Sequence, residues 1–188
     1  MEIDFEKFHI GMARSQITLS QHRPEWAECF CLTSQDLFLI LPDLKIELFH
    51  VGSTAIPDIK AKPILDVMGV VKDLSEFDVL KSTIEKNGYV WKGEYGIPGR
   101  RYCVKYNQEQ TAEYVHLHVF AQGNPEIERH LLFCNYLRAF PELAQKYDGL
   151  KDDLRQKYSR EREKYTESKA DFILAIIEEA KAWKGQRF

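Results

Sequence analysis

The sequence lacks the features that mark membrane, secreted or repeat proteins. No apolar run in its 188 residues approaches the ~20 residues that span a bilayer. The opening stretch, MEIDFEK, is acidic and has no apolar core, so it does not predict a signal peptide. The chain contains no internal repeat and no low-complexity segment. We therefore expect a single domain over residues 1–188 that has no membrane partner.

Cysteine is sparse, and there is no excess of positive charge. The four cysteines, Cys29, Cys31, Cys103 and Cys134, are too scattered for a paired Cys-x-x-Cys zinc site or a dense disulfide framework. We therefore expect a cytoplasmic protein with reduced thiols. The formal net charge of −3 argues against a general nucleic-acid-binding protein, which is usually strongly basic. Local basic clusters can still bind one phosphate-bearing ligand.

What is present is the pattern of an α/β (α+β) domain. Alternating or continuous apolar runs predict strands over residues 46–51, 64–71, 89–91, 101–106 and 113–120. Helical spacing, proline starts and an Asn-Gly stop predict helices over residues 24–40, 73–87, 125–139, 141–157 and 162–184. Residues 1–16 are predicted to be loosely ordered, and residues 17–19 to form a short edge strand. These elements predict a mixed sheet flanked by helices, with a helical C-terminal part over residues 125–188.

Residues 50–71 carry the strongest functional signal. A strand ends at Gly52, Ser53 and Thr54, one short helical turn follows, and a second strand carries Asp66. Glycine lets the backbone approach closely or take a positive φ, and free amide and hydroxyl groups at such a turn can hold a phosphate. A carboxylate in an apolar run is costly to bury without a partner or a cation. The alternative is a tight turn into a core strand, with Asp66 at its exposed end or capping a loop.

The chain resembles the GrpB-like family, whose members are similar to the nucleotidyltransferase superfamily. The resemblance is carried by residues 50–57 (HVGSTAIP), 62–66 (KPILD), 96–102 (GIPGRRY), 116–120 (HLHVF), 128–130 (ERH) and 165–169 (YTESK). The superfamily pattern is Gly-Ser, then two acidic residues two apart on a strand, with a third acid on a neighbouring strand. Gly52, Ser53 and Asp66 match it, which implies a nucleotidyltransferase-like fold with Asp66 and Ser53 at catalytic positions.

One position departs from that pattern. Met68 stands where the second acidic residue would be, so that strand alone does not predict ordinary two-metal coordination. Either one metal suffices, or Glu47, Glu113 or a histidine substitutes, or the activity has been lost.

His116 and His118 share one face of their predicted strand, because side chains alternate along a strand. If that strand neighbours the one carrying Asp66, the three side chains converge. Such a set can hold a divalent metal, Mg²⁺ or Mn²⁺ or another, or donate to a phosphate from neutral imidazoles. The alternative is hydrogen bonding within a polar sheet face that the C-terminal helices cover.

Two lysines are candidate phosphate contacts. Lys62 enters the Asp66 strand and faces either a phosphate or solvent. Tyr165 and Lys169 lie four apart and therefore share a helix face. The family resemblance implies that this helix closes over the site with Lys169 contacting phosphate; the alternative is a surface lysine.

Arg100 and Arg101 are further candidate phosphate contacts, because the planar guanidinium suits phosphate. Alternation sends the two side chains to opposite faces, so only one is expected at a site. The alternative is an exposed arginine paired with Glu94 or Glu113.

Other polar features favour structural interpretations. His50 is expected to support the turn, and Arg129 to lie on a solvated helix face. The alternating charges of residues 151–164 predict a solvated helical face as well.

Three functions remain open. The first is an enzyme or degenerate enzyme that binds a nucleotide or another phosphorylated small molecule over Gly52 and Ser53 and transfers a nucleotidyl group with a divalent metal. The second is a non-catalytic module that binds a ligand or a protein partner. The third is another metal-dependent reaction centred on the two histidines. The sequence carries no expectation for the oligomeric state.

Overall fold

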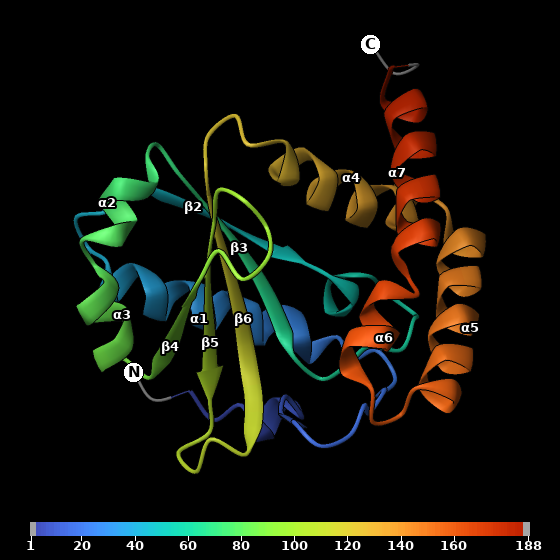
Figure 1. The fold of residues 1–188 in the computed structure, drawn as a ribbon, viewed down its shortest axis with the longest axis horizontal. Helices are drawn as coiled ribbons and strands as arrows, with labels where there is room; N and C mark the ends of the chain where they lie inside the picture. Colours follow the sequence, from blue (N-terminus) through green and yellow to red (C-terminus); the bar gives the residue numbers. More distant parts are fainter. Residues whose placement is uncertain (1–2, 186–188) are drawn as a thin grey trace.

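Six strands form one mixed sheet in the computed structural model, which describes residues 3–185 (Figure 1). The strands are β1 (Met12–Ala13), β2 (Ile46–Val51), β3 (Leu65–Val71), β4 (Tyr89–Gly93), β5 (Arg100–Tyr106) and β6 (Ala112–Ala121). Their order is β2-β3-β6-β5-β4, and β1 pairs with one end of β6. β3 and β6 run parallel, while the other paired strands are antiparallel. The predicted mixed sheet is confirmed.

The helices agree with the sequence pattern, with two exceptions. They are α1 (Glu25–Ile40), α2 (Leu74–Asp78), α3 (Lys81–Lys86), α4 (Pro125–Ala139), α5 (Pro141–Lys157), α6 (Arg162–Glu167) and α7 (Ala170–Gly185), with 3₁₀ turns η1 (Glu6–Phe8) and η2 (Ser53–Ala55). Proline is the first residue of both α4 and α5, as predicted. The helix predicted over residues 73–87 is divided into α2 and α3, and the one over residues 162–184 into α6 and α7. Within residues 3–185, no helix combines the length and the apolar character that crossing a bilayer requires.

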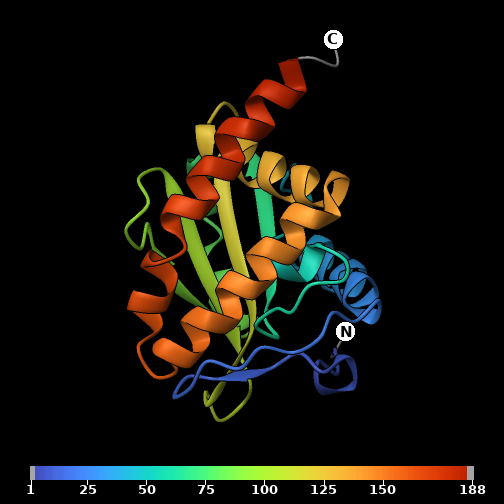
Figure 2. The same cartoon turned by 90° about the vertical axis from the view of Figure 1, so that its right-hand side faces the viewer.

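Each face of the sheet has its own apolar core. On one face, α1, α2, α3 and η1 pack over side chains such as Val67 and Leu117. On the other face, α4, α5 and α7 pack over Met68 and Phe120 (Figure 2). Phe77 of α2 and Ile84 of α3 both reach the first core, where each is fully buried. The second face is the one that also carries the polar cluster described below.

The N-terminal segment is more ordered than the sequence predicts. Phe5, Phe8, Ile10 and Met12 are all buried, and Met12 pairs with Glu113 of β6. The prediction that residues 1–16 are loosely ordered is therefore wrong for the described residues 3–16; residues 1–2 lie outside the described part. The acidic and basic side chains between these apolar residues obscure their pattern in the sequence.

The strand predicted over residues 17–19 is absent as well. Ser20 makes only an isolated bridge with Ala61, and Ile17 packs in a small cluster with Leu154 and Tyr165. The Ile17 amide donates to the Ser159 carbonyl at 2.8 Å, so this segment is held by α5 and the residues after it and not by the sheet.

A buried ion cluster fixes the segment that leads into β3. Asp148 of α5 is 6% exposed and accepts a 2.6 Å hydrogen bond from the Lys60 backbone N–H as well as pairing with the Lys60 ammonium. Lys151 is 2% exposed; its ammonium donates to the Lys60 carbonyl and lies 3.4 Å from Asp148. The solvated face predicted for residues 151–164 is thus wrong at Lys151, because this lysine satisfies buried polar groups of another segment.

We expect Asp148→Ala to destabilise the protein by about 2–3 kcal/mol, because it removes a charged acceptor and leaves the Lys151 ammonium buried with a single partner. The free energy of unfolding from urea denaturation measures this loss. Asp153→Ala, an exposed aspartate on the same helix, is the control and should change stability by no more than about 0.5 kcal/mol. Equal effects of the two changes would contradict a special role for Asp148.

Candidate functional site

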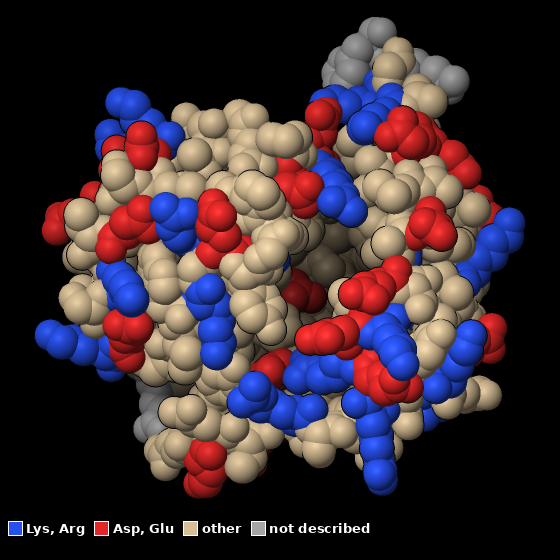
Figure 3. All heavy atoms as spheres, in the orientation of Figure 1, with Lys and Arg blue, Asp and Glu red and all other residues tan. Residues whose placement is uncertain are grey.

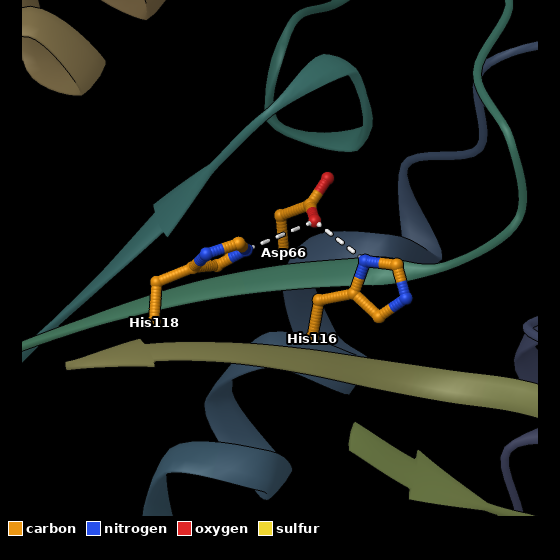
Figure 4. Close-up of side chains that lie close together, drawn as sticks. All are labelled: Asp66, His116 and His118. Carbon is orange, nitrogen blue, oxygen red and sulfur yellow. Dashed lines mark ion pairs between the residues drawn. The ribbon is translucent and has the colours of Figure 1, made fainter. Parts of the chain in front are cut away.

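Asp66, His116 and His118 converge on the face of the sheet that carries α4, α5 and α7 (Figure 4). Parallel pairing of β3 with β6 sets Asp66 opposite His116 and Met68 opposite His118. His116 Nδ1 lies 3.3 Å and His118 Nε2 lies 3.6 Å from Asp66 Oδ1. One ligand atom from each of the three side chains lies within 4.8 Å of the others. The convergence predicted from strand alternation is therefore confirmed.

The charges of these three groups depend on one another. Burial alone would raise the pKa of Asp66, but hydrogen bonds and charge from His116 and His118 hold it well below its usual range. Burial would likewise lower the pKa of His116, but Asp66 and Glu113 raise it above its ordinary value. For His118 burial prevails and the pKa is lowered. Asp66 is thus ionised and His118 favours its neutral form, and these are the forms that ligate metals.

Glu113 lies behind His116. Its Oε2 is 3.1 Å from His116 Nε2, and it accepts hydrogen bonds of 3.2 and 2.6 Å from Arg162 of α6. Burial works against ionisation of Glu113, but His116 and Arg162 outweigh it and lower the pKa to about 2. Glu113 is thus a buried anion that orients His116 and forms an ion pair with Arg162. Glu47, the other carboxylate considered as a substitute, is exposed on β2.

The turn after β2 packs directly on Asp66. Gly52 has φ +70°, and a Cβ there would lie 2.9 Å from both Cβ and Cγ of Asp66, so only glycine fits. Thr54 is buried and its Oγ1 lies 3.0 Å from His50 Nε2, which confirms that His50 supports the turn. Ser53 is half-buried and hydrogen-bonds with the Tyr147 side chain. Of the two hydroxyls, the one on Ser53 is therefore the more available to a ligand.

Lys62 and Lys169 flank a single aromatic ring. Their ammonium nitrogens lie 4.7 and 4.6 Å from the centre of the Tyr165 ring. Burial, followed by repulsion from Lys169 and Arg162, lowers the pKa of Lys62 to about 7, and burial lowers the pKa of Lys169 to about 8. Among residues 3–185 neither ammonium has a carboxylate within ion-pair distance, although both are attracted by Asp66. The pair is a half-buried cationic cluster without a close counter-ion.

The two arginines face opposite sides of the sheet, as alternation predicts. Arg100 is 6% exposed; its NH1 lies 3.3 Å from His118 Nδ1, and its other nitrogens donate to the Glu94 and Tyr95 carbonyls. Arg101 instead forms a bidentate pair with Asp78 of α2, with one bond of 2.7 Å. The structure therefore places Arg101 away from the site, and its candidate role as a phosphate contact is corrected.

His130 of α4 also belongs to the cluster, which the sequence analysis missed. Its ring centre lies 5.8 Å from that of His118, and burial lowers its pKa to about 4. Its Nε2 is buried with no hydrogen-bond partner among the described residues. Arg129, by contrast, pairs with Glu126 at 3.1 Å on the helix surface. Helical spacing with the buried residues Cys134 and Leu137 was the signal that points His130 inward.

A hollow opens on the surface of the molecule in the view of Figure 3. Figure 3 shows a pit in the middle of the face seen in Figure 1, with an acidic group in its depth and both basic and acidic side chains on its rim. The β4–β5 loop lies on one side of the pit and α6 on the other. The described groups can together hold a cation at Asp66 and an anion beside Lys62 and Lys169.

The lysine pair makes stability depend on pH. Lys62 has a pKa of about 7 in the folded chain against an ordinary 10.5, so between these values the unfolded chain binds more protons. Stability therefore rises with pH over this window, by at most about 1.4 kcal/mol per pH unit for each such group.

We expect Lys62→Met to raise the free energy of unfolding at pH 7 and to flatten its rise between pH 7 and 9, measured by urea denaturation in phosphate-free buffer. Lys146→Met, at an exposed lysine of α5, is the control; identical slopes in Lys62→Met and wild type would contradict the prediction.

Comparison with solved structures identifies the architecture. The conserved protein GrpB from Enterococcus faecalis has a TM-score of 0.81 at 37% identity, with 88% of this chain and 99% of that chain covered. The Cid1 poly(U) polymerase, bound to MgGTP, has a TM-score of 0.51 at 14% identity, with 72% of this chain and 44% of that chain covered. At that identity the second likeness shows the fold alone, and it confirms the predicted nucleotidyltransferase-like architecture.

Sequence relatives agree with the first of these structures. The UPF0157 protein YqkA of Bacillus subtilis is 38% identical over 180 residues, which are 96% of this chain and 51% of YqkA, so the chain spans about half the length of that relative. The glutamate-rich protein GrpB of Alkalihalophilus pseudofirmus is 27% identical over 172 residues, covering 90% of this chain and 99% of that protein. The profile of the GrpB protein family matches residues 16–179. The chain therefore belongs to the GrpB family.

Proposed function

We propose that this chain binds one divalent transition metal at Asp66, His116 and His118 and, beside it, the phosphate groups of a nucleotide or another phosphorylated small molecule. The observation that carries the proposal is the convergence of a carboxylate and two imidazoles within 4.8 Å, next to the Gly52 turn.

The donor set decides which metal fits. Imidazole nitrogen suits Mn²⁺, Zn²⁺ and their neighbours better than Mg²⁺, which prefers oxygen ligands. Three protein ligands also leave positions open for a ligand oxygen. Met68 is fully buried and has no oxygen to offer, so a second metal has no carboxylate ligand on β3.

The two histidines are not equally ready to bind a metal. His116 must first lose one proton, because Asp66 and Glu113 raise its pKa. Its neutral form then keeps a proton on Nε2 against Glu113 and turns the Nδ1 lone pair toward Asp66. His118 has Arg100 against its Nδ1, and since a guanidinium can only donate, the neutral ring then carries its proton on Nε2, toward Asp66. Metal binding through His118 Nε2 thus requires the proton to move and Arg100 to turn away. His116 and Asp66 are the stronger ligands.

The phosphate side of the proposal rests on uncompensated positive charge. Lys62 and Lys169 place two half-buried ammonium groups over one tyrosine ring, and no carboxylate of residues 3–185 lies within ion-pair distance of either. A bound dianion would relieve their repulsion and their loss of solvation. The Ser53 hydroxyl, which follows Gly52 in the turn and hydrogen-bonds with Tyr147, would add a neutral donor.

The chemistry that the metal would supply is polarisation of a phosphoryl oxygen and neutralisation of charge, which supports nucleotidyl or phosphoryl transfer. Glu113 would orient the His116 imidazole, and the lysines would hold the anion. The buried Met68 favours a second candidate, a module that binds the same ligand without turnover.

We expect the wild-type chain to bind one Mn²⁺ or Zn²⁺, measured by calorimetry and by metal content after dialysis. Asp66→Asn and His116→Asn should weaken binding at least about 10- to 100-fold, since even changes beyond the direct ligands cost that much. His118→Asn should cost less. His9→Asn is the control, because His9 is exposed and distant in the fold, and asparagine tolerates its φ of +53°. Equal metal binding by Asp66→Asn and wild type would refute the metal site.

We expect ATP or UTP to raise the melting temperature of the metal-loaded protein by mass action, and Lys169→Met to reduce that shift. Pyrophosphate release from the same samples decides between the two candidates: release supports transfer, and saturable binding without release supports the binding module. Absence of any nucleotide-dependent shift in the metal-loaded wild type would contradict both.

A further inference from the structure

Tyr95 exposes a large aromatic ring on the β4–β5 loop, and this loop lies beside the hollow (Figures 1 and 3). Tyr95 lies between β4 and β5, and 67% of its surface is exposed. A tyrosine ring offers a large flat apolar surface with a polar hydroxyl at its tip, so an exposed one can pack against a planar ligand. The proposed metal and phosphate contacts make no use of this ring.

The loop is built to hold the ring in place. The Tyr95 backbone has φ +45°, which is uncommon for a residue with a side chain. The Arg100 guanidinium donates to the Tyr95 carbonyl at 2.6 Å, and the Gly99 N–H donates to the Glu94 carboxylate at 2.7 Å, closing the loop. The inner face of the ring stacks on Tyr102 at 5.3 Å between centres. Its position is therefore fixed before any ligand arrives, while the other face stays open.

The ring lies at the His118 end of the cluster. Tyr102 pairs with His118 across the β5–β6 ladder, and their ring centres are 5.0 Å apart. Lys62 lies toward the other end, where its charge interacts with Glu113 and Arg162. From Glu113 to His118, β6 advances by about 16 Å at ~3.3 Å per residue. Aromatic ring, carboxylate–histidine cluster and ammonium pair thus follow one another along β6.

We propose that the open face of Tyr95 is the stacking surface for a planar heterocyclic base, so that the ligand of this site is a nucleotide with more than one phosphate. The base stacks on Tyr95, the phosphates next to it pass the cluster at Asp66, and the terminal phosphate meets Lys62 and Lys169. Base stacking on an aromatic side chain tolerates any base, because every base has a π-face. This inference rests on the proposed function and adds the ligand class to it.

Calorimetry on the full chain with saturating Mn²⁺ tests the inference with two probes, ATP and inorganic tripolyphosphate, which shares the phosphate chain and lacks a base. We expect wild type to bind ATP more tightly than tripolyphosphate. Tyr95→Ala should weaken the binding of ATP by about 5- to 100-fold, as expected for the loss of one base stack. It should weaken the binding of tripolyphosphate by less than about twofold. Tyr95→Phe should retain ATP binding, because it keeps the ring. Phe38→Ala, at an aromatic residue of α1 that is 47% exposed on the opposite face, is the matched control.

The outcomes separate this inference from the proposed function. Tyr95 is not a base-stacking surface if wild type binds ATP and tripolyphosphate with equal affinity. The same conclusion follows if Tyr95→Ala leaves both affinities unchanged or lowers both by the same factor. In either case the proposed phosphate site stands without Tyr95. If the metal-loaded wild type binds neither probe, the proposed function fails and the inference fails with it.

Discussion

The Asp66 carboxylate, shared between two imidazoles, is the interaction on which the rest of the site depends. An ionised carboxylate next to an apolar core must be compensated, and β3 places Met68, fully buried, on the same face two residues later. Parallel pairing with β6 supplies the compensation, since it sets His116 directly opposite Asp66. Gly52 completes the arrangement, because any side chain at that position would enter the space of the carboxylate. Moving any one of these elements would leave a charge without a partner.

The C-terminal helices are tied to this interaction by charge as well as by apolar packing. Arg162 of α6 holds Glu113, Glu113 holds His116, and His116 holds Asp66. Lys169, which lies between α6 and α7, and Lys62, from the segment before β3, both lie over the Tyr165 ring. The cationic and anionic parts of the site are therefore built from segments distant in sequence, so the site is complete only where the helical part packs on the sheet.

The sequence was sufficient where a local signal decides the structure. Proline starts gave the bounds of α4 and α5, and strand alternation placed His116 and His118 on one face and separated Arg100 from Arg101. Prediction failed where a distant partner decides. The pairing of Arg101 with Asp78, the burial of Lys151 against the Lys60 carbonyl and the order of the segment around Phe8 all depend on contacts far apart in the chain. Glu113 and His130 were visible in the sequence, but only the strand order and the inward face of α4 show what they contact.

The charge balance of the site explains why a methionine can stand where the superfamily pattern has an acid. A second carboxylate on β3 would offset a second cation, and it would also repel a phosphate chain. Here a single ionised carboxylate faces two lysines and Arg100, with Glu113 already neutralised by Arg162. One divalent cation would leave the hollow with net positive charge, which only a polyanion can balance at low energetic cost. Under the proposed function, Met68 in place of the acid would shift the source of positive charge from a second metal to the lysine pair, and the site would still require a multiply charged ligand.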